Sequence, residues 1–165
     1  MLTTANLISF LAEREGFKAK VYDDKQPWLD LNPGDEELVQ GTLTYGHGLT
    51  MDAGGAPLKL GMTISLQESF DRVRAYVDAE VEPVLENLVH IDLTGEQYDA
   101  LGSQVYQFGA SEVSGWRLWG RINRQESGEM IAMEWMDGTY HWDGQPTESI
   151  WKRRVAELLM FMGFD

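Results

Sequence analysis

The hydrophobic pattern of this chain changes its period at Ser65, and that change limits the possible folds most strongly. Before it, the stretches "AKVYDD", "ELVQG" and "TLTYGHGLT" carry β-branched and aromatic residues between Pro, Gly and Asp clusters, which predicts a small antiparallel sheet. After it, "SLQESFDRVRAYVDAEVEPVLENL" opens with the capping-box pair Ser65 and Glu68 and keeps a helical period. Pro83 should end or kink this helix. The pattern therefore predicts an α+β fold.

Further helices are predicted on both sides of this change. "LISFLAERE" is amphipathic and should end at Gly16, while "TGEQYDALGSQVYQFG" starts on the capping box Thr94 and Gln97 and should end at Gly109. "GWRLWGRINRQ", "SGEMIAMEWMDG" and "TESIWKRRVAELLMFMG" predict three more helices. The tryptophans at 116, 119 and 135 have helical spacing, and we expect them in the core.

These elements suggest one domain, residues 1–165, made of two lobes with a cleft between them. The β-containing lobe would span roughly residues 13–62 and the larger, all-helical lobe residues 63–165, with an N-terminal helix at 4–14 packing on the helical lobe. A cleft of this kind suits a polymeric substrate.

Charge and composition exclude several classes of function. The chain has 13 basic and 27 acidic residues and a net charge of −14, which disfavours binding to nucleic acid or to an anionic membrane. It has no cysteine, and its three histidines, at 47, 90 and 141, lack zinc-binding spacing. We therefore expect no metal site. A monomer that uses no cofactor is a separate expectation. The N-terminus lacks the basic region of a secretion signal, which predicts synthesis in the cytoplasm.

Two acidic residues, Glu15 and Asp24, flank the first predicted strand. Glycoside hydrolysis needs one protonated carboxylic acid for the leaving oxygen and one ionised carboxylate. Glu15 lies at a helix end beside Phe17 and Val21, where desolvation would favour its protonated form, whereas Asp24 begins a polar loop and should stay charged. The spacing alone is equally compatible with two ordinary surface carboxylates among the 27 acidic residues.

The continuation of the sequence resembles the bacteriophage lysozyme, or endolysin, family of muramidases. The family pattern is a Glu-Gly, an Asp in a Tyr-x-Asp triplet, and a Thr before a Gly-His; here these are Glu15-Gly16, Asp24, Thr42 and Gly46-His47. "LTGEQYDALGSQVYQFG" resembles the family's central helix, and "WKRRVAELLMF" resembles its closing helix. The resemblance covers nearly the whole chain and implies a lysozyme-like fold.

The resemblance also implies roles for individual residues. Glu15 would be the general acid, Asp24 would assist at the opposite face of the sugar, and Thr42 would hold the attacking water or the substrate. Tyr45, Gly46 and His47, together with Tyr106 and Gln107 of the central helix, would lie at the substrate. His47 could instead be structural, and Tyr106 could pack in the core. Arg153 or Arg154 would pair with Glu15, unless both lie at a solvated helix end.

The sequence departs from the family pattern in three respects. Seventeen residues, 25–41, separate Asp24 from Thr42, which is longer than the family's usual segment. Trp28 in this insertion could stack on a sugar ring or could pack the loop onto its own lobe. Thr44 occupies a position where the family commonly has Gly, so the local turn could differ. The third departure is the acidity, which disfavours free diffusion onto an anionic cell wall.

The implied substrate is bacterial peptidoglycan, and the implied reaction is hydrolysis of the bond between N-acetylmuramic acid and N-acetylglucosamine. The enzyme would be made in an infected bacterium and would act on the wall after release or from the virion. Two alternatives remain. A lytic transglycosylase would use one glutamate and would need neither Asp24 nor Thr42, and a non-catalytic wall-binding domain could keep the same fold.

Overall fold

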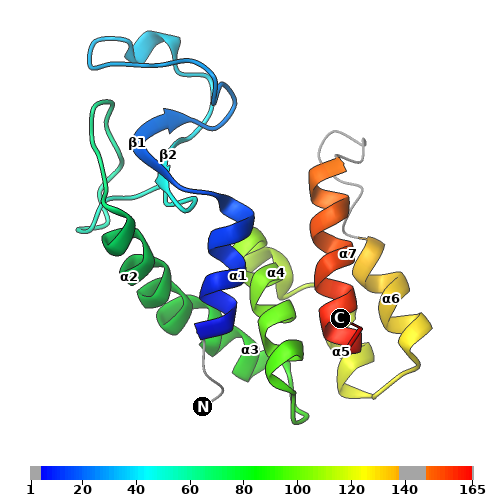
Figure 1. The fold of residues 1–165 in the computed structure, drawn as a ribbon. Coiled ribbons are helices and arrows are strands. Elements are labelled where there is room, and N and C mark those ends of the chain that lie inside the picture. Colours follow the sequence, from blue (N-terminus) through cyan, green and yellow to red (C-terminus); the bar gives the residue numbers. More distant parts are fainter. Residues whose placement is uncertain (1–4, 138–147, 165) are drawn as a thin grey trace. The chain divides into compact units, whose positions relative to one another are not determined.

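The computed structural model describes residues 5–137 and 148–164. The chain divides into two compact units, one formed by Ile8–Tyr76 and the other by Met1–Leu7 with Val77–Asp165. Figure 1 shows a small sheet, long loops and helices in the first unit, and helices without a sheet in the described part of the second, so the α+β prediction is confirmed. His141 of the three histidines lies outside the described residues. Within the described ranges, no helix has the length and hydropathy needed to cross a membrane.

The sheet consists of β1 (Lys18–Asp23) and β2 (Leu43–Gly46), paired antiparallel with Tyr22 opposite Thr44. The register is irregular between Lys18 and Tyr22. The other edge of β1 bonds to a later segment, because Val21 N donates to Met62 O at 3.0 Å. Strands are therefore confirmed in two of the three predicted stretches.

The prediction of a strand in "ELVQG" was wrong. Residues Glu36–Leu38 form a short 3-10 helix, η1. Acidic side chains occupy the backbone donors just before it: Asn32 N donates to Asp35 Oδ2 at 2.9 Å, and Gly34 N donates to Glu36 Oε2 at 3.0 Å. Such local side-chain bonds favour turns over a strand ladder, which explains the failure.

Helix α1 (Ala5–Glu15) ends where the sequence predicts. Leu7, Ile8 and Leu11 are buried along one face. Gly16 follows with φ 66°, the left-handed conformation that stops a helix, and its N–H donates to Ala12 O at 3.1 Å. The catalytic candidate Glu15 is thus the last helical residue, fixed just before the chain turns into β1.

The long helical segment after Ser65 is interrupted, as Pro83 predicts. Ser65 Oγ accepts from Glu68 N at 3.1 Å at the start of α2 (Leu66–Tyr76). A π-helical turn, η2 (Val77–Val81), separates α2 from α3 (Glu82–Leu88), and Pro83 lies in the first turn of α3. Because proline has no N–H to donate to the preceding turn, the regular helical ladder fails at this point.

The helical unit is organised around α4 (Gly95–Val113). Residues 99–105 of this helix are all buried, and the helix packs on α3, η2 and α7. Thr94 and Gln97 form the predicted capping box, and Gly109 leaves the helical conformation at φ 77°, ψ 158°. Both predicted ends are confirmed, although helical turns resume after Gly109.

The three remaining predicted helices are confirmed as α5 (Leu118–Asn123), α6 (Gly128–Asp137) and α7 (Glu148–Met162). Arg121 joins α5 to α6 by donating to Glu134 at 2.6 Å. Trp119 and Trp135 are core residues, as expected, whereas Trp116 is half-buried against Phe108.

Candidate active site

The carboxylate of Glu15 lies against the Gly46–Gly48 turn that follows β2. The turn is closed by two backbone bonds of 3.0 Å between Tyr45 and Leu49. A methyl group at Gly48, which has φ 82°, would lie 3.3 Å from Glu15 Oε2. Glycine at this position therefore lets the backbone approach the half-buried carboxylate closely.

His47 stabilises this turn from inside the unit. Its side chain is 3% exposed, its backbone N donates to Ser69 Oγ at 3.0 Å, and its Nδ1 lies 2.8 Å from the same oxygen. Its ring contacts Phe17 and Phe70. Burial lowers the pKa of His47, and the charge of Glu15 opposes this shift only in part. These contacts favour the structural interpretation of His47.

Asp24 and Thr42 bind each other across the base of the inserted loop. Asp24 N donates to Thr42 O at 3.1 Å, and Thr42 N donates to Asp24 Oδ1 at 2.7 Å. Both residues are exposed. The insertion therefore does not separate the two candidates, because its ends meet at this pair. Thr44, the second departure from the pattern, is a buried residue within β2 opposite Tyr22, so no altered turn occurs there.

Tyr22 connects Glu15 with Asp24. Burial raises the pKa of the Tyr22 phenol, and the negative charges of Glu15 and Asp24 raise it further. Glu15 precedes β1 and Asp24 directly follows it, with Tyr22 between them in the strand. Two carboxylates in this arrangement can supply one acid and one base to a bound substrate.

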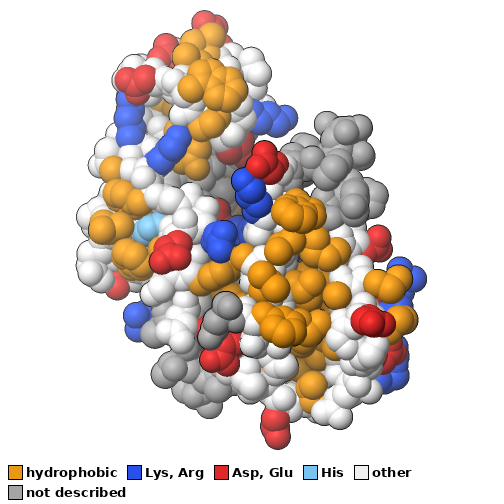
Figure 2. Space-filling view, turned by 45° about the vertical axis from the view of Figure 1, so that its right-hand side comes forward, with side chains coloured by type: hydrophobic (Ala, Val, Ile, Leu, Met, Phe, Trp, Pro, Cys, Tyr) orange, Lys and Arg blue, Asp and Glu red, His pale blue; other side chains and the backbone are white. Residues whose placement is uncertain are grey.

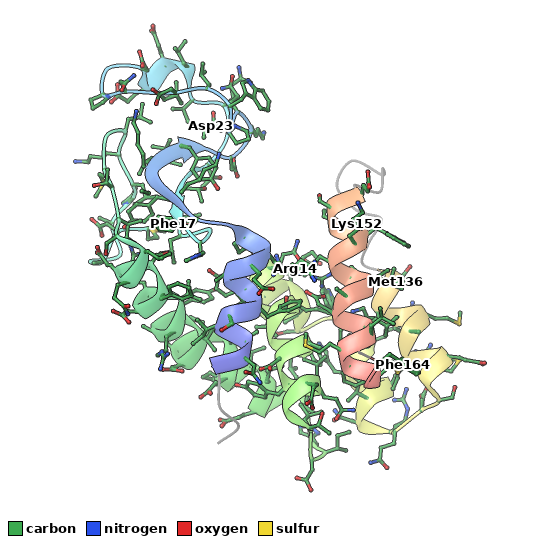
Figure 3. All side chains as sticks on the ribbon, in the orientation of Figure 1. Arg14, Phe17, Asp23, Met136, Lys152 and Phe164 are labelled. Carbon is green, nitrogen blue, oxygen red and sulfur yellow. The ribbon has the colours of Figure 1, made fainter. Side chains whose placement is uncertain are left out.

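Asp23 is a site residue that the sequence analysis missed. It is fully buried, and its carboxylate accepts from Lys25 N at 2.9 Å, Gln26 Nε2 at 3.1 Å and Gln40 N at 2.6 Å. Burial alone would raise its pKa, but these bonds outweigh it and lower the pKa to about 2. Figure 3 places Asp23 at the end of β1, where the inserted loop leaves the strand. In an extended strand, Asp23 lies on the same face as the buried Val21, and this alternation was the sequence signal that could have predicted its burial.

Trp28 does not pack the inserted loop onto its own lobe. Its side chain is 79% exposed, so the packing alternative was wrong. Ser69 is a second residue that the analysis missed, although it shares the buried face of α2 with Val73. A serine at the core spacing of an amphipathic helix was the signal for it.

The helical unit holds the remaining candidates in a buried polar network. Arg154 Nη2 donates to Gln107 Oε1 at 2.6 Å and to Glu157 Oε1 at 2.7 Å, and Arg153 Nε donates to Glu157 Oε1 at 3.2 Å. Burial raises the pKa of Glu157, with the two arginines opposing this shift. Both arginines are buried, so the solvated alternative was wrong. Tyr106 is half-buried beside Gln107. Pairing of either arginine with Glu15 stays a prediction.

Solved structures identify the fold. A variant of P22 lysozyme is 25% identical with a TM-score of 0.75, covering 98% of this chain and 99% of that one. An endolysin from the Escherichia coli O157:H7 phage FAHEc1 shares the fold with a TM-score of 0.79 at 19% identity, covering 98% and 93%. The chain is therefore a lysozyme-fold protein of the glycoside hydrolase type.

Sequence comparison gives the family. Residues 12–157 match the family described as phage lysozyme. The endolysin of Salmonella phage P22 is 28% identical over 123 residues, which are 74% of this chain and 74% of that protein. This chain belongs to the phage lysozyme family, whose members are peptidoglycan-hydrolysing muramidases.

Proposed function

We propose that this protein hydrolyses the β-1,4 bond between N-acetylmuramic acid and N-acetylglucosamine, with Glu15, Asp24 and Thr42 as its catalytic residues. The observation that carries the proposal is the Asp24–Thr42 pair, bonded in both directions at the end of the strand that Glu15 precedes. A lytic transglycosylase needs only one glutamate, so it would not require the bonded Asp24–Thr42 pair.

Each residue has a distinct task. Glu15 protonates the leaving glycosidic oxygen, which suits a half-buried carboxyl group held at the rigid end of α1. Asp24 acts as the general base that draws a proton from the attacking water. The Thr42 hydroxyl, which can donate and accept at once, orients that water. A route in which water attacks directly inverts the anomeric carbon.

The remaining residues support this arrangement. Tyr45, Gly46 and His47 are buried, so their part in substrate binding is to shape the turn that brings Gly48 to the sugar. Tyr106 and Gln107 would also contact the substrate, with Gln107 oriented by Arg154. The protein acts as a monomer on the cell wall, either after release from the infected cell or from the virion.

The test is digestion of purified peptidoglycan sacculi by the wild type and by Glu15→Gln, with fragments analysed by mass spectrometry. We expect fragments with reducing muramic acid ends from the wild type and none from the variant, with unchanged circular dichroism. Anhydro ends would establish the transglycosylase instead. If a folded Glu15→Gln variant still releases fragments, Glu15 is not the general acid.

The stereochemical outcome gives a second test. Proton NMR of the first product from a soluble strand should show the α-anomer appearing before mutarotation, because the bond cleaved is β and the attack is by water. A β-anomer formed first would mean that Asp24 acts as a nucleophile.

A further inference from the structure

The inserted loop is fastened along β1 so that a groove stays open between them. Lys18 Nζ donates to Pro27 O at 2.9 Å, and Lys20 Nζ donates to Asp30 Oδ1 at 2.6 Å and to Asn32 Oδ1 at 3.1 Å. The groove has a volume of about 300 Å³. Because these lysine bonds fix the loop along β1, the groove is part of the folded structure of this unit.

Trp28 lines this groove and presents its ring to solvent. It is 79% exposed, and Leu29 and Leu38 of the same loop are 37% and 47% exposed. Figure 2 shows hydrophobic side chains gathered at the top of the view, where Figure 1 draws the inserted loop, with charged side chains around them. A planar apolar surface with a polar surround is typical of a ligand site.

The groove also carries positive charge, which is scarce in this protein. Four of its 13 basic residues lie within residues 14–25, and Lys18 and Lys20 line the groove. Because Lys20 is paired with Asp30, which also lines the groove, Lys18 supplies the remaining positive charge. Lys18 Nζ lies 4.2 Å from the centre of the Tyr22 ring. An ammonium group has three donors, and the bond to Pro27 uses one, which leaves Lys18 able to bind an anion.

The groove continues toward the proposed catalytic residues. Tyr22, which lines the groove, lies two residues before Asp24 in the chain and pairs with Thr44 across the sheet. A chain of sugars bound at the two carboxylates would therefore pass along β1 into the groove. Because the groove adjoins the proposed catalytic residues and contains the positively charged Lys18, we take its ligand to be a further part of the same anionic glycan strand.

We propose that the inserted loop forms an additional saccharide subsite, in which one N-acetyl sugar of the glycan strand stacks on Trp28. A carboxylate attached to that sugar, from its lactyl group where this is free or from its stem peptide, binds Lys18. The inference rests on the proposed function for the identity of the strand. The subsite makes the enzyme prefer long strands, because only these reach from the catalytic residues to Trp28. Loss of one stacking platform corresponds to about tenfold in affinity.

The experiment measures binding without cleavage. In the Glu15→Gln background, calorimetry gives the dissociation constant for glycan strands that carry free lactyl carboxylates and for neutral chitin oligosaccharides of equal length. Trp28→Ala should weaken binding of long strands about tenfold and of short ones hardly at all, and Trp28→Phe should restore most of it. Trp151→Ala, which removes a 47% exposed tryptophan from α7, is the matched control.

Charge is tested in the same assay. The Glu15→Gln protein should bind the carboxylate-bearing strand more tightly than the chitin oligosaccharide, and both Lys18→Gln and high salt should reduce this preference. Equal effects of Trp28→Ala and Trp151→Ala, or equal effects on long and short strands, would overturn the subsite. Because sacculus digestion by the wild type tests hydrolysis separately, failure of the subsite and failure of the proposed function give different results.

Discussion

Removing the Asp23 carboxylate should loosen both the inserted loop and the Asp24–Thr42 pair at its base. The group accepts from Lys25 N and Gln26 Nε2 at the start of the loop and from Gln40 N at its end. Asp23→Ala leaves these three donors without their acceptor. Asp23→Asn keeps one oxygen but turns an NH₂ group toward the remaining donors, so it should cost less than alanine and still be harmful.

The size of the effect follows from the number of bonds. A hydrogen bond to a charged group contributes about 1.5–3 kcal/mol, so three give about 4.5 kcal/mol at the lower bound. Lys25 and Gln40 are exposed, so water replaces part of this loss. We therefore expect Asp23→Ala to lower the free energy of unfolding by about 3 kcal/mol, which lowers Tm by roughly 6–12 °C in a chain of this size.

The pH dependence distinguishes this cause from a simple packing defect. Since folding lowers the pKa of Asp23 from its ordinary 3.8 to about 2, its stabilisation is fully present above pH 3.8 and is lost as the pH falls through 2. The difference in Tm between wild type and Asp23→Asn should thus be largest near neutral pH and shrink from pH 4 to pH 2. Differential scanning calorimetry at several pH values measures it. A difference that stays constant over this range would refute the reasoning.

Three further changes test other parts of the structure. Asp99→Asn should stabilise the protein by about 1–3 kcal/mol at pH 7, because burial raises the pKa of Asp99 to about 6 and ionisation of the carboxyl group above that pH opposes folding. The wild type and the variant should be closer in stability at pH 4. A stability difference that is the same at pH 4 and pH 7 would contradict this. Gly41→Ala places a methyl group against the carboxylates of Asp23 and Asp24 and should destabilise by about 1–3 kcal/mol with loss of hydrolysis, whereas Gly54→Ala should have little effect on either. Because the net charge is −14, the protein should be repelled by an anionic cell wall at low salt. Hydrolysis should therefore speed up when ionic strength rises from about 0.01 to 0.15 M, which shortens the Debye length from about 30 to 8 Å. If the rate of turbidity loss falls over this range, charge repulsion does not limit hydrolysis.

The helices were predictable because their ends carry local signals. These signals act on backbone bonds within a few residues. In the structure, Thr94 and Gln97 cap the start of α4, Gly16 ends α1, and Pro83 interrupts the helix after Ser65. The failed strand in "ELVQG" has the opposite origin: its β-type pattern is short, and neighbouring acidic side chains capture the backbone donors. Short apolar stretches between turn-forming residues do not determine a strand by themselves.

The catalytic candidates were found through a resemblance, while the residues that position them are visible only in three dimensions. Gln40 lies 17 positions from Asp23, and Ser69 lies 22 positions from His47, so no local spacing reveals either contact. Trp28 could have been buried or exposed on sequence alone. The lysines of β1 that bond to the loop on either side of Trp28 are contacts that no local spacing reveals.

Asp23 explains how this chain accepts a long insertion beside its proposed catalytic residues. The loop leaves β1 at Lys25 and returns at Gln40, and the same buried carboxylate binds the backbone N–H of both. The mutual bonds of Asp24 and Thr42 then close the loop at its base. Because the cost of closing a loop grows only slowly with its length, anchored ends make the residues between them free to vary. The catalytic geometry and the surface that carries Trp28 can therefore change independently, which is the condition for adding a subsite without disturbing the chemistry.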